Sequence, residues 1–123
     1  MAENVAPDLK GIWQGELRGV SLGDAANGLT VDADAKPKIE TFPVEMIVDF
    51  QDSSAIAGIK KHKYGNDRFV AVFRNGNTSL HGADAEGDMD LSILPDGGIE
   101  SCYTEHERHR AYASCTVLRR KQQ

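Results

Sequence analysis

The sequence predicts an all-β protein: a small up-and-down antiparallel meander of about eight strands closed into a β-barrel. Three observations lead to this prediction. Apolar and polar residues alternate over short segments, almost no segment has the period of an amphipathic helix, and turn residues separate the segments at close intervals. With 123 residues, the chain has the length of a single domain.

The expected strands follow from this alternation and from the turns between them. The clearest strand has alternate apolar residues on one face, namely Phe42, Val44, Met46, Val48 and Phe50. The Asn-Gly pair in "NGN" and the sequence "PDGG" predict tight turns. The eight expected strands cover residues 11–20, 42–50, 55–60, 68–74, 78–82, 88–94, 99–106 and 110–119.

The remaining segments are expected to lie outside the sheet. Residues 1–9 are expected to form a flexible N-terminus and residues 120–123 a short C-terminal tail. Residues 21–41, which are rich in Gly, Ala and Asp, are expected to form one long loop that acts as a lid. Because closing the sheet removes exposed strand edges, and no long return connection follows this loop, a barrel is favoured over a two-sheet sandwich.

Composition and charge exclude several classes of function. The formal net charge of -5 argues against general binding to nucleic acid or to an anionic membrane. No apolar run approaches the roughly 18 residues of a membrane span, and the start "MAENVAPDLK" lacks a signal-peptide pattern. We therefore expect a cytoplasmic protein, unless a leader was removed, and no motif indicates a cofactor or a metal site.

The two cysteines are expected to lie opposite each other. If the last hairpin turns around residues 108–109, Cys102 faces Cys115 on the neighbouring strand, within reach of a disulfide. A cytoplasmic location favours two reduced thiols, and a disulfide is the alternative.

The only tryptophan of the chain lies in the first expected strand. The segment Gly11-Ile12-Trp13 is on that strand, and Arg119 and Arg120 end the last one, which is its neighbour in a closed barrel. A guanidinium can therefore lie over the indole as a cation–π pair worth about 0.5 to 2 kcal/mol. This pattern resembles the calycin group of lipocalins, fatty-acid-binding proteins and avidin-like proteins. The resemblance implies that Trp13 closes one end of the barrel and that a ligand binds at the other.

An eight-stranded barrel is just wide enough to be filled by side chains or to hold one small ligand. If small inward residues such as Gly15, Ala57 and Gly82 leave the barrel underfilled, an apolar cavity forms; otherwise the same apolar residues are simply core. The expected ligand-binding residues are Phe42, Val44, Met46, Phe73, His81, Met89 and Tyr103.

Three functional hypotheses follow. The first is a non-enzymatic protein that binds a small, mostly apolar molecule. The second is a small cyclase or isomerase that uses His81, Tyr103 or Glu16 for proton transfer, since allene oxide cyclase also has an eight-stranded barrel. The third is an inhibitor or immunity-type protein, in which the loops bind a partner.

Other residues carry weaker expectations. The strand at residues 68–74 is apolar on both faces, so Val70 and Val72 are expected to form a homodimer interface. His106 and His109 superficially suggest a metal site, but two histidines around a tight turn rarely converge on one ion. His62 lies in a basic segment that indicates either an anion site or a solvated turn.

Overall fold

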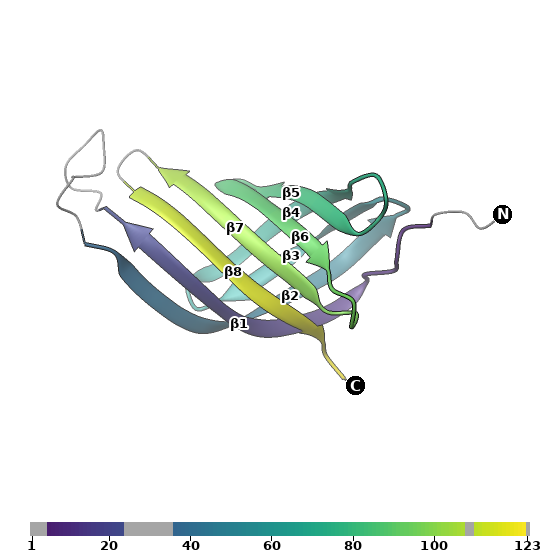
Figure 1. The fold of residues 1–123 in the computed structure, drawn as a ribbon, viewed down its shortest axis with the longest axis horizontal. Coiled ribbons are helices and arrows are strands. Elements are labelled where there is room, and N and C mark those ends of the chain that lie inside the picture. The colour runs from purple at the N-terminus through teal and green to yellow at the C-terminus, as the bar shows by residue number, and fades with distance from the viewer. Residues whose placement is uncertain (1–4, 24–35, 108–109, 123) are drawn as a thin grey trace.

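The computed structural model describes residues 5–23, 36–107 and 110–122. They form eight antiparallel strands in a meander, and β8 pairs with β1 to close the barrel (Figure 1). The predicted all-β meander and its closure are therefore confirmed. The strands are β1 (Gly11–Leu22), β2 (Lys38–Asp52), β3 (Ala55–His62), β4 (Gly65–Phe73), β5 (Ser79–Asp84), β6 (Gly87–Ile93), β7 (Ile99–Glu107) and β8 (Arg110–Arg120).

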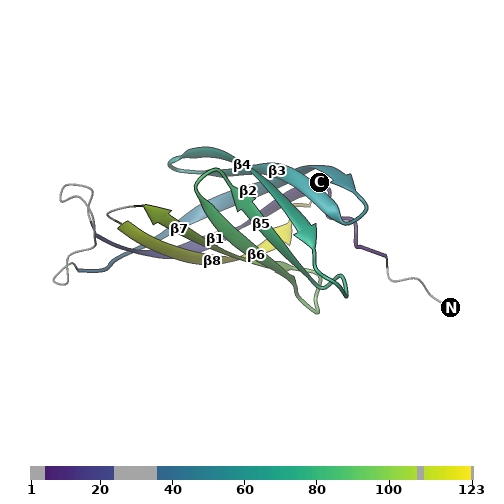
Figure 2. The ribbon, with the colours of Figure 1, turned by 90° about the horizontal axis from the view of Figure 1, so that it is seen from above.

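The strands run obliquely across an elongated barrel that has two distinct ends (Figures 1 and 2). At one end β1 begins and β8 ends, whereas β1 ends and β2 begins at the other. Because β1 continues to Leu22 and β2 starts at Lys38, the long connection is shorter than the expected 21–41. The lid expected within it falls largely on residues 24–35, which lie outside the described residues.

The face predicted for β2 is wrong at one residue. Val48 pairs with Gly58, whereas Phe50 pairs with Ala57, so Asp49 is an extra residue in β2. Such a bulge reverses the alternation of side chains beyond it. Phe50 is consequently 52% exposed, while Phe42, Met46 and Val48 are buried.

The apolar side chains inside the barrel are tightly packed. Leu80, Leu91 and Ile99 expose none of their surface, and Met89 exposes 1%. A side chain lining a void that could hold a water molecule would have exposed surface there, so Leu80, Leu91 and Ile99 line no such void. The buried cluster comprises Leu9, Trp13, Met46, Val48, Ile56, Phe69, Ala71, Phe73, Leu80, Met89, Leu91, Ile99 and Leu118.

Gly15, Ala57 and Gly82 do not create empty space inside the barrel. A Cβ atom added to Gly15 would lie 2.2 Å from the carbonyl oxygen of Val117, and one added to Gly82 would lie 2.6 Å from that of Val70. The backbone of the adjacent strand therefore occupies the space beside each glycine. Ala57 lies between the inward, buried Ile56 and Gly58 and faces outward.

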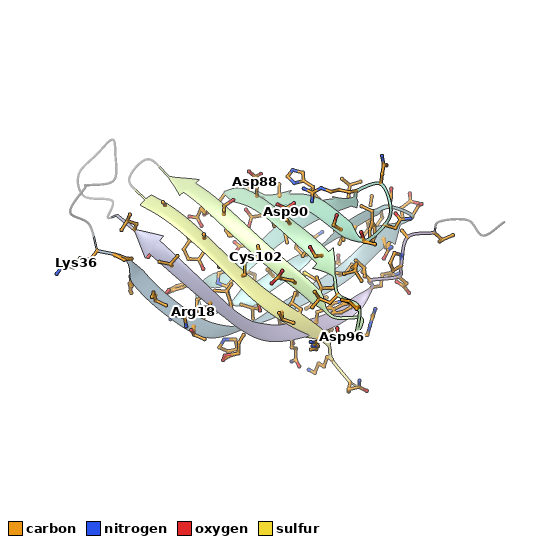
Figure 3. All side chains as sticks on the ribbon, in the orientation of Figure 1. Arg18, Lys36, Asp88, Asp90, Asp96 and Cys102 are labelled. Atoms are coloured by element: carbon orange, nitrogen blue, oxygen red, sulfur yellow. A yellow bond between two sulfur atoms is a disulfide. The ribbon has the colours of Figure 1, made fainter. Side chains whose placement is uncertain are left out.

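Trp13 closes the end of the barrel at which β1 begins and β8 ends. Its indole is 2% exposed and donates a hydrogen bond to the carbonyl oxygen of Leu9, with Nε1 2.9 Å from the oxygen. The guanidinium carbon of Arg120 lies 4.4 Å from the ring centroid. The cation–π partner is thus Arg120, while Arg119 pairs with Asp96 at the same end of the barrel (Figure 3).

Within residues 1–9, which are expected to form a flexible N-terminus, Pro7 and Leu9 are hydrogen-bonded to Gln51 of β2, and residues 1–4 lie outside the described residues. Leu9 is 2% exposed, and its amide donates to Oε1 of Gln51. Nε2 of Gln51 donates in turn to the carbonyl oxygen of Pro7. Arg120, which was expected to begin a tail, is the last residue of β8 and donates to the carbonyl oxygens of Asp8 and Lys10.

Cys102 on β7 pairs with Cys115 on β8, as the predicted turn requires, and the two form a disulfide (Figure 3). The expectation of two reduced thiols is therefore wrong. The bond joins residues 13 apart in sequence, so it restricts only a short loop of the unfolded chain.

Replacing Cys102 and Cys115 with serine is expected to lower the free energy of unfolding by about 2 to 3 kcal/mol, because the open chain gains conformational entropy when unfolded. Urea denaturation of oxidised wild-type and variant protein measures this difference. Wild-type protein treated with a reductant serves as the control and should match the variant. Two titratable thiols per freshly purified chain, under denaturing and non-reducing conditions, would contradict the structure.

Candidate functional site

The end of the barrel opposite Trp13 has an interior of aromatic and polar side chains, and we call this end the mouth. It lies where odd-numbered strands end and even-numbered strands begin, and β1, β2, β7 and β8 reach farther there than β5 and β6 (Figure 1). The strand alternation directs these side chains to the interior. The inward residues of the mouth are Glu40, Phe42, Lys60, His62, Asp67, Asp84, Tyr103 and Tyr112.

A triad of Lys60, Asp84 and Tyr103 lies between the packed core and the mouth. Nζ of Lys60 is 3.3 Å from Oδ2 of Asp84, and these side chains are only 17% and 4% exposed. The same ammonium lies 3.9 Å from the ring centroid of Tyr103. The Tyr103 hydroxyl donates to Oδ1 of Asp84 at 3.0 Å. Three strands, β3, β5 and β7, thereby place one acid, one base and one phenol in contact.

The triad is arranged to keep Asp84 ionised. Burial by itself raises the pKa of this carboxyl, but the amide of Glu86, the Lys60 ammonium and the Tyr103 hydroxyl together hold it below its ordinary value. Burial and the bond to Asp84 raise the pKa of Tyr103 far above its usual range. Tyr103 is therefore a neutral hydrogen-bond donor at physiological pH and does not act as a base.

A second cluster forms the rim of the mouth. The rings of Phe42, His62 and Tyr64 contact one another, with centroids 5.7 to 6.3 Å apart. The Tyr64 hydroxyl donates to Oε1 of Glu40 at 2.5 Å, and Nζ of Lys63 lies 3.3 Å from the same oxygen. The turn between β3 and β4 is thus fastened to the first residues of β2.

His62 is fully engaged by its neighbours. Its Nε2 lies 2.7 Å from Oδ2 of Asp67, and its Nδ1 accepts a hydrogen bond from the amide of Tyr64 at 3.2 Å. This pair of bonds has Nε2 as the donor and Nδ1 as the acceptor. Since the Nδ1 lone pair is occupied, His62 in this arrangement holds the rim together and offers no free base to a ligand.

The structure brings six of the seven expected ligand-binding residues into the interior, but it divides them. Met46, Phe73 and Met89 belong to the packed core, and Val44 packs against it. Phe42 and Tyr103 lie at the mouth.

The sequence leaves His81 open between the barrel interior and solvent, and the structure places it on the outer face of β5, where its side chain is 57% exposed and 3.5 Å from Asp90. His81 therefore lies apart from the other expected ligand-binding residues. Glu16 is also exposed and follows the inward Gly15 on β1. His81, Glu16 and Tyr103 therefore do not converge, and the enzyme hypothesis loses its named acid–base groups.

Sequence reasoning missed Lys60 and Asp84. Lys60 ends an expected strand and shares a face with Ile56 and Gly58, but Ala57, on the opposite face, is the residue expected to point inward. Asp84 was assigned to a turn, whereas β5 continues through it. Its two bonds to the amides of Glu86 and Gly87 show why it sits at the beginning of the next turn.

A shallow hollow of about 570 Å³ lies on the outer side of β1, β2 and β3. Most of its lining belongs to outward, solvated side chains, and within it Nε2 of Gln14 donates a long hydrogen bond of 3.4 Å to Oε2 of Glu45. Its lining residues are Gln14, Gly15, Glu16, Pro43, Val44, Glu45 and Lys61. We therefore place the candidate site at the mouth.

Comparisons with known proteins assign no function to the site. No protein-family model matches the chain, and no curated protein matches it. Among the described residues, no three His, Cys, Asp or Glu side chains are grouped to hold a metal ion, although the side chains of His106 and His109 lie outside that part of the chain. The described residues contain no helix long and apolar enough to cross a membrane.

Proposed function

We propose that the protein is a calycin-like barrel that binds a small molecule at the mouth. The observation that carries this proposal is the change in the interior from a packed apolar core to partly accessible rings around the Lys60, Asp84 and Tyr103 triad. Binding sites for small molecules commonly combine aromatic walls with a few fixed polar groups. The plug at Trp13 leaves the mouth as the end at which a ligand would enter.

The chemistry of the mouth favours an amphipathic ligand over the mostly apolar one expected from the sequence. Around Leu80, Leu91 and Ile99 the packed core leaves no space for a wholly apolar molecule, because these side chains expose no surface. At the mouth, the rings of Tyr103 and Tyr112 lie 6.3 Å apart, and Ser114 and Thr116 are buried nearby on β8. An amphipathic molecule, with an apolar or aromatic part against these rings and a polar group near Lys60, suits this surface best.

Native mass spectrometry of freshly purified protein tests the proposal. We expect a bound small molecule that is released on denaturation. Tyr112→Ala removes a wall of the mouth and should lose the compound, whereas Val117→Ala, on the outer face of the same strand, should retain it. Equal retention by both variants, or no compound bound after incubation with a metabolite extract, would count against the proposal.

The same spectra test the homodimer. Val70 and Val72 lie on the outer face of β4, 60% and 49% exposed. Ala57 and Phe50 continue this apolar surface across β3 and β2, in register with Val70. We propose that two copies pair through this surface, and a monomer at high micromolar concentration by light scattering would contradict it.

We also infer that the protein works in an oxidising compartment. Disulfides such as Cys102–Cys115 persist in oxidising surroundings and are rare in the cytoplasm. The cytoplasmic location expected from the sequence conflicts with this bond, and the thiol titration described above distinguishes the two.

A further inference from the structure

At the rim of the mouth, the ammonium group of Lys63 lies between aromatic rings. Nζ of Lys63 lies 5.1 Å from the ring centroid of Phe42 and 5.0 Å from that of Tyr64. The two rings are nearly perpendicular, with an interplanar angle of 87°. His62 adds a third ring, and Oε1 of Glu40 lies 3.3 Å from the ammonium. We call Glu40, Phe42, His62 and Tyr64 the rim cage.

The rim cage has the composition of a site for organic cations. Ring faces carry negative electrostatic potential and attract a cation within about 6 Å of the centroid. A carboxylate beside the rings adds direct charge compensation. The bond from Tyr64 and the neighbouring lysines hold the pKa of Glu40 below its ordinary value, so its charge persists at physiological pH. The bound state needs no rearrangement of the rings, because Lys63 already occupies the position of a ligand cation.

Lys63 is suited to leave the cage. Its side chain is 48% exposed, whereas that of Glu40 is 19% exposed. Lys63 lies in the turn between β3 and β4, outside both strands, so the movement of its side chain disturbs no strand pairing. Removing Lys63 would leave Glu40 with Lys38, which is 3.8 Å away and 74% exposed.

We propose that the rim cage binds the ammonium group of an organic cation, and that Lys63 occupies this position in the unliganded protein. This inference rests on the function proposed above, because it names the chemical class of the molecule bound at the mouth. The carboxylate of Glu40 and the faces of Phe42 and Tyr64 replace the solvation of the cation. The rest of the molecule then extends toward Tyr103 and Tyr112.

Choline is the probe for this proposal, and its uncharged carbon isostere, 3,3-dimethylbutan-1-ol, is the comparison. Binding is measured by NMR titration at constant ionic strength. Lys63→Ala vacates the cage and is expected to bind choline about tenfold more tightly than the wild type. Lys38→Ala removes the same charge next to Glu40 without vacating the cage, so it should resemble the wild type.

Further variants separate the cage from general charge effects. Adding Glu40→Gln to Lys63→Ala should reverse the gain in choline affinity, while thermal unfolding reports whether the double variant is folded. Equal affinities of Lys63→Ala and Lys38→Ala for choline would overturn the proposal, as would equal binding of choline and its isostere. If native mass spectrometry instead finds a bound anionic or neutral compound, the cation class is wrong and the mouth remains a binding site.

Discussion

Replacing Trp13 with alanine is expected to lower the free energy of unfolding by about 3 to 5 kcal/mol, the usual cost of truncating a large buried side chain. The indole is 2% exposed and lies between Leu9 and Arg120, so its removal leaves a cavity at the end of the barrel. Urea denaturation of the two proteins measures the difference. A small molecule at the mouth should still bind to whatever fraction of the variant is folded.

The two C-terminal arginines provide a matched comparison for this prediction. Arg120→Ala removes the cation over Trp13 and two bonds to backbone carbonyls, and it should destabilise the protein measurably. Arg119→Ala removes an equal charge, but its pair with Asp96 is exposed, so the loss of stability should be smaller than that of Arg120→Ala. A Trp13→Ala variant that folds with full stability and fails to bind ligand would show that Trp13 is no plug.

Replacing Asp84 with asparagine is expected to cost about 3 to 5 kcal/mol, because it leaves the Lys60 ammonium largely buried without its carboxylate. The asparagine oxygen can still accept the amides of Glu86 and Gly87, so the change acts on the atom that faces Lys60. Combining it with Lys60→Met removes both charges and should recover much of the loss. Chemical denaturation of the single and double variants completes the cycle.

An exposed ion pair serves as the control for this cycle. Arg74 and Asp90 lie 2.7 Å apart, but their side chains are 52% and 54% exposed, so Asp90→Asn should cost less than about 1 kcal/mol. If Asp84→Asn costs no more than Asp90→Asn, the triad contributes no buried charge pair. Failure of the double variant to regain stability would mean that Asp84 acts mainly through its other bonds.

The Asp84→Asn variant is also expected to differ from the wild type in how its free energy of unfolding depends on pH. Because the pKa of Asp84 is lower in the folded state than its ordinary value, ionised Asp84 stabilises the fold above that ordinary value. This contribution is lost as the pH falls through the lowered folded pKa. The stability difference between wild type and Asp84→Asn should therefore shrink in acid, and curves that stay parallel would contradict the pKa direction.

Much of the fold was predictable because its determinants are local. Alternation in β2 and the turn residues around Gly76 and Gly97, which adopt positive φ, fixed where strands lie and where they reverse. The position of one turn also predicted that Cys102 would face Cys115. The oxidation of this pair was not predictable in the same way, because it depends on the surroundings of the two sulfur atoms.

The candidate site was predicted less well than the fold. The alternation of β2 indicated that Phe42 points inward, whereas the short β5 left both an inward and a solvent-facing His81 open. The bulge at Asp49 left no mark in the residue pattern, since Phe50 continues the apolar alternation of β2. A bulge is a feature of the pairing between two strands, here β2 and β3, so the residue pattern of one strand does not reveal it.

The sequence by itself determined an eight-stranded meander, the closure that joins β1 to β8, and an inward Trp13 near a terminal arginine. These features follow from residue periodicity and turn chemistry, which act over a few residues. Only the tertiary structure decided that Lys60, Asp84 and Tyr103 meet, and that Arg120 and not Arg119 covers the indole. The physical reason is that strand tilt and barrel closure set which side chains face each other across the interior, and residues distant in sequence determine both.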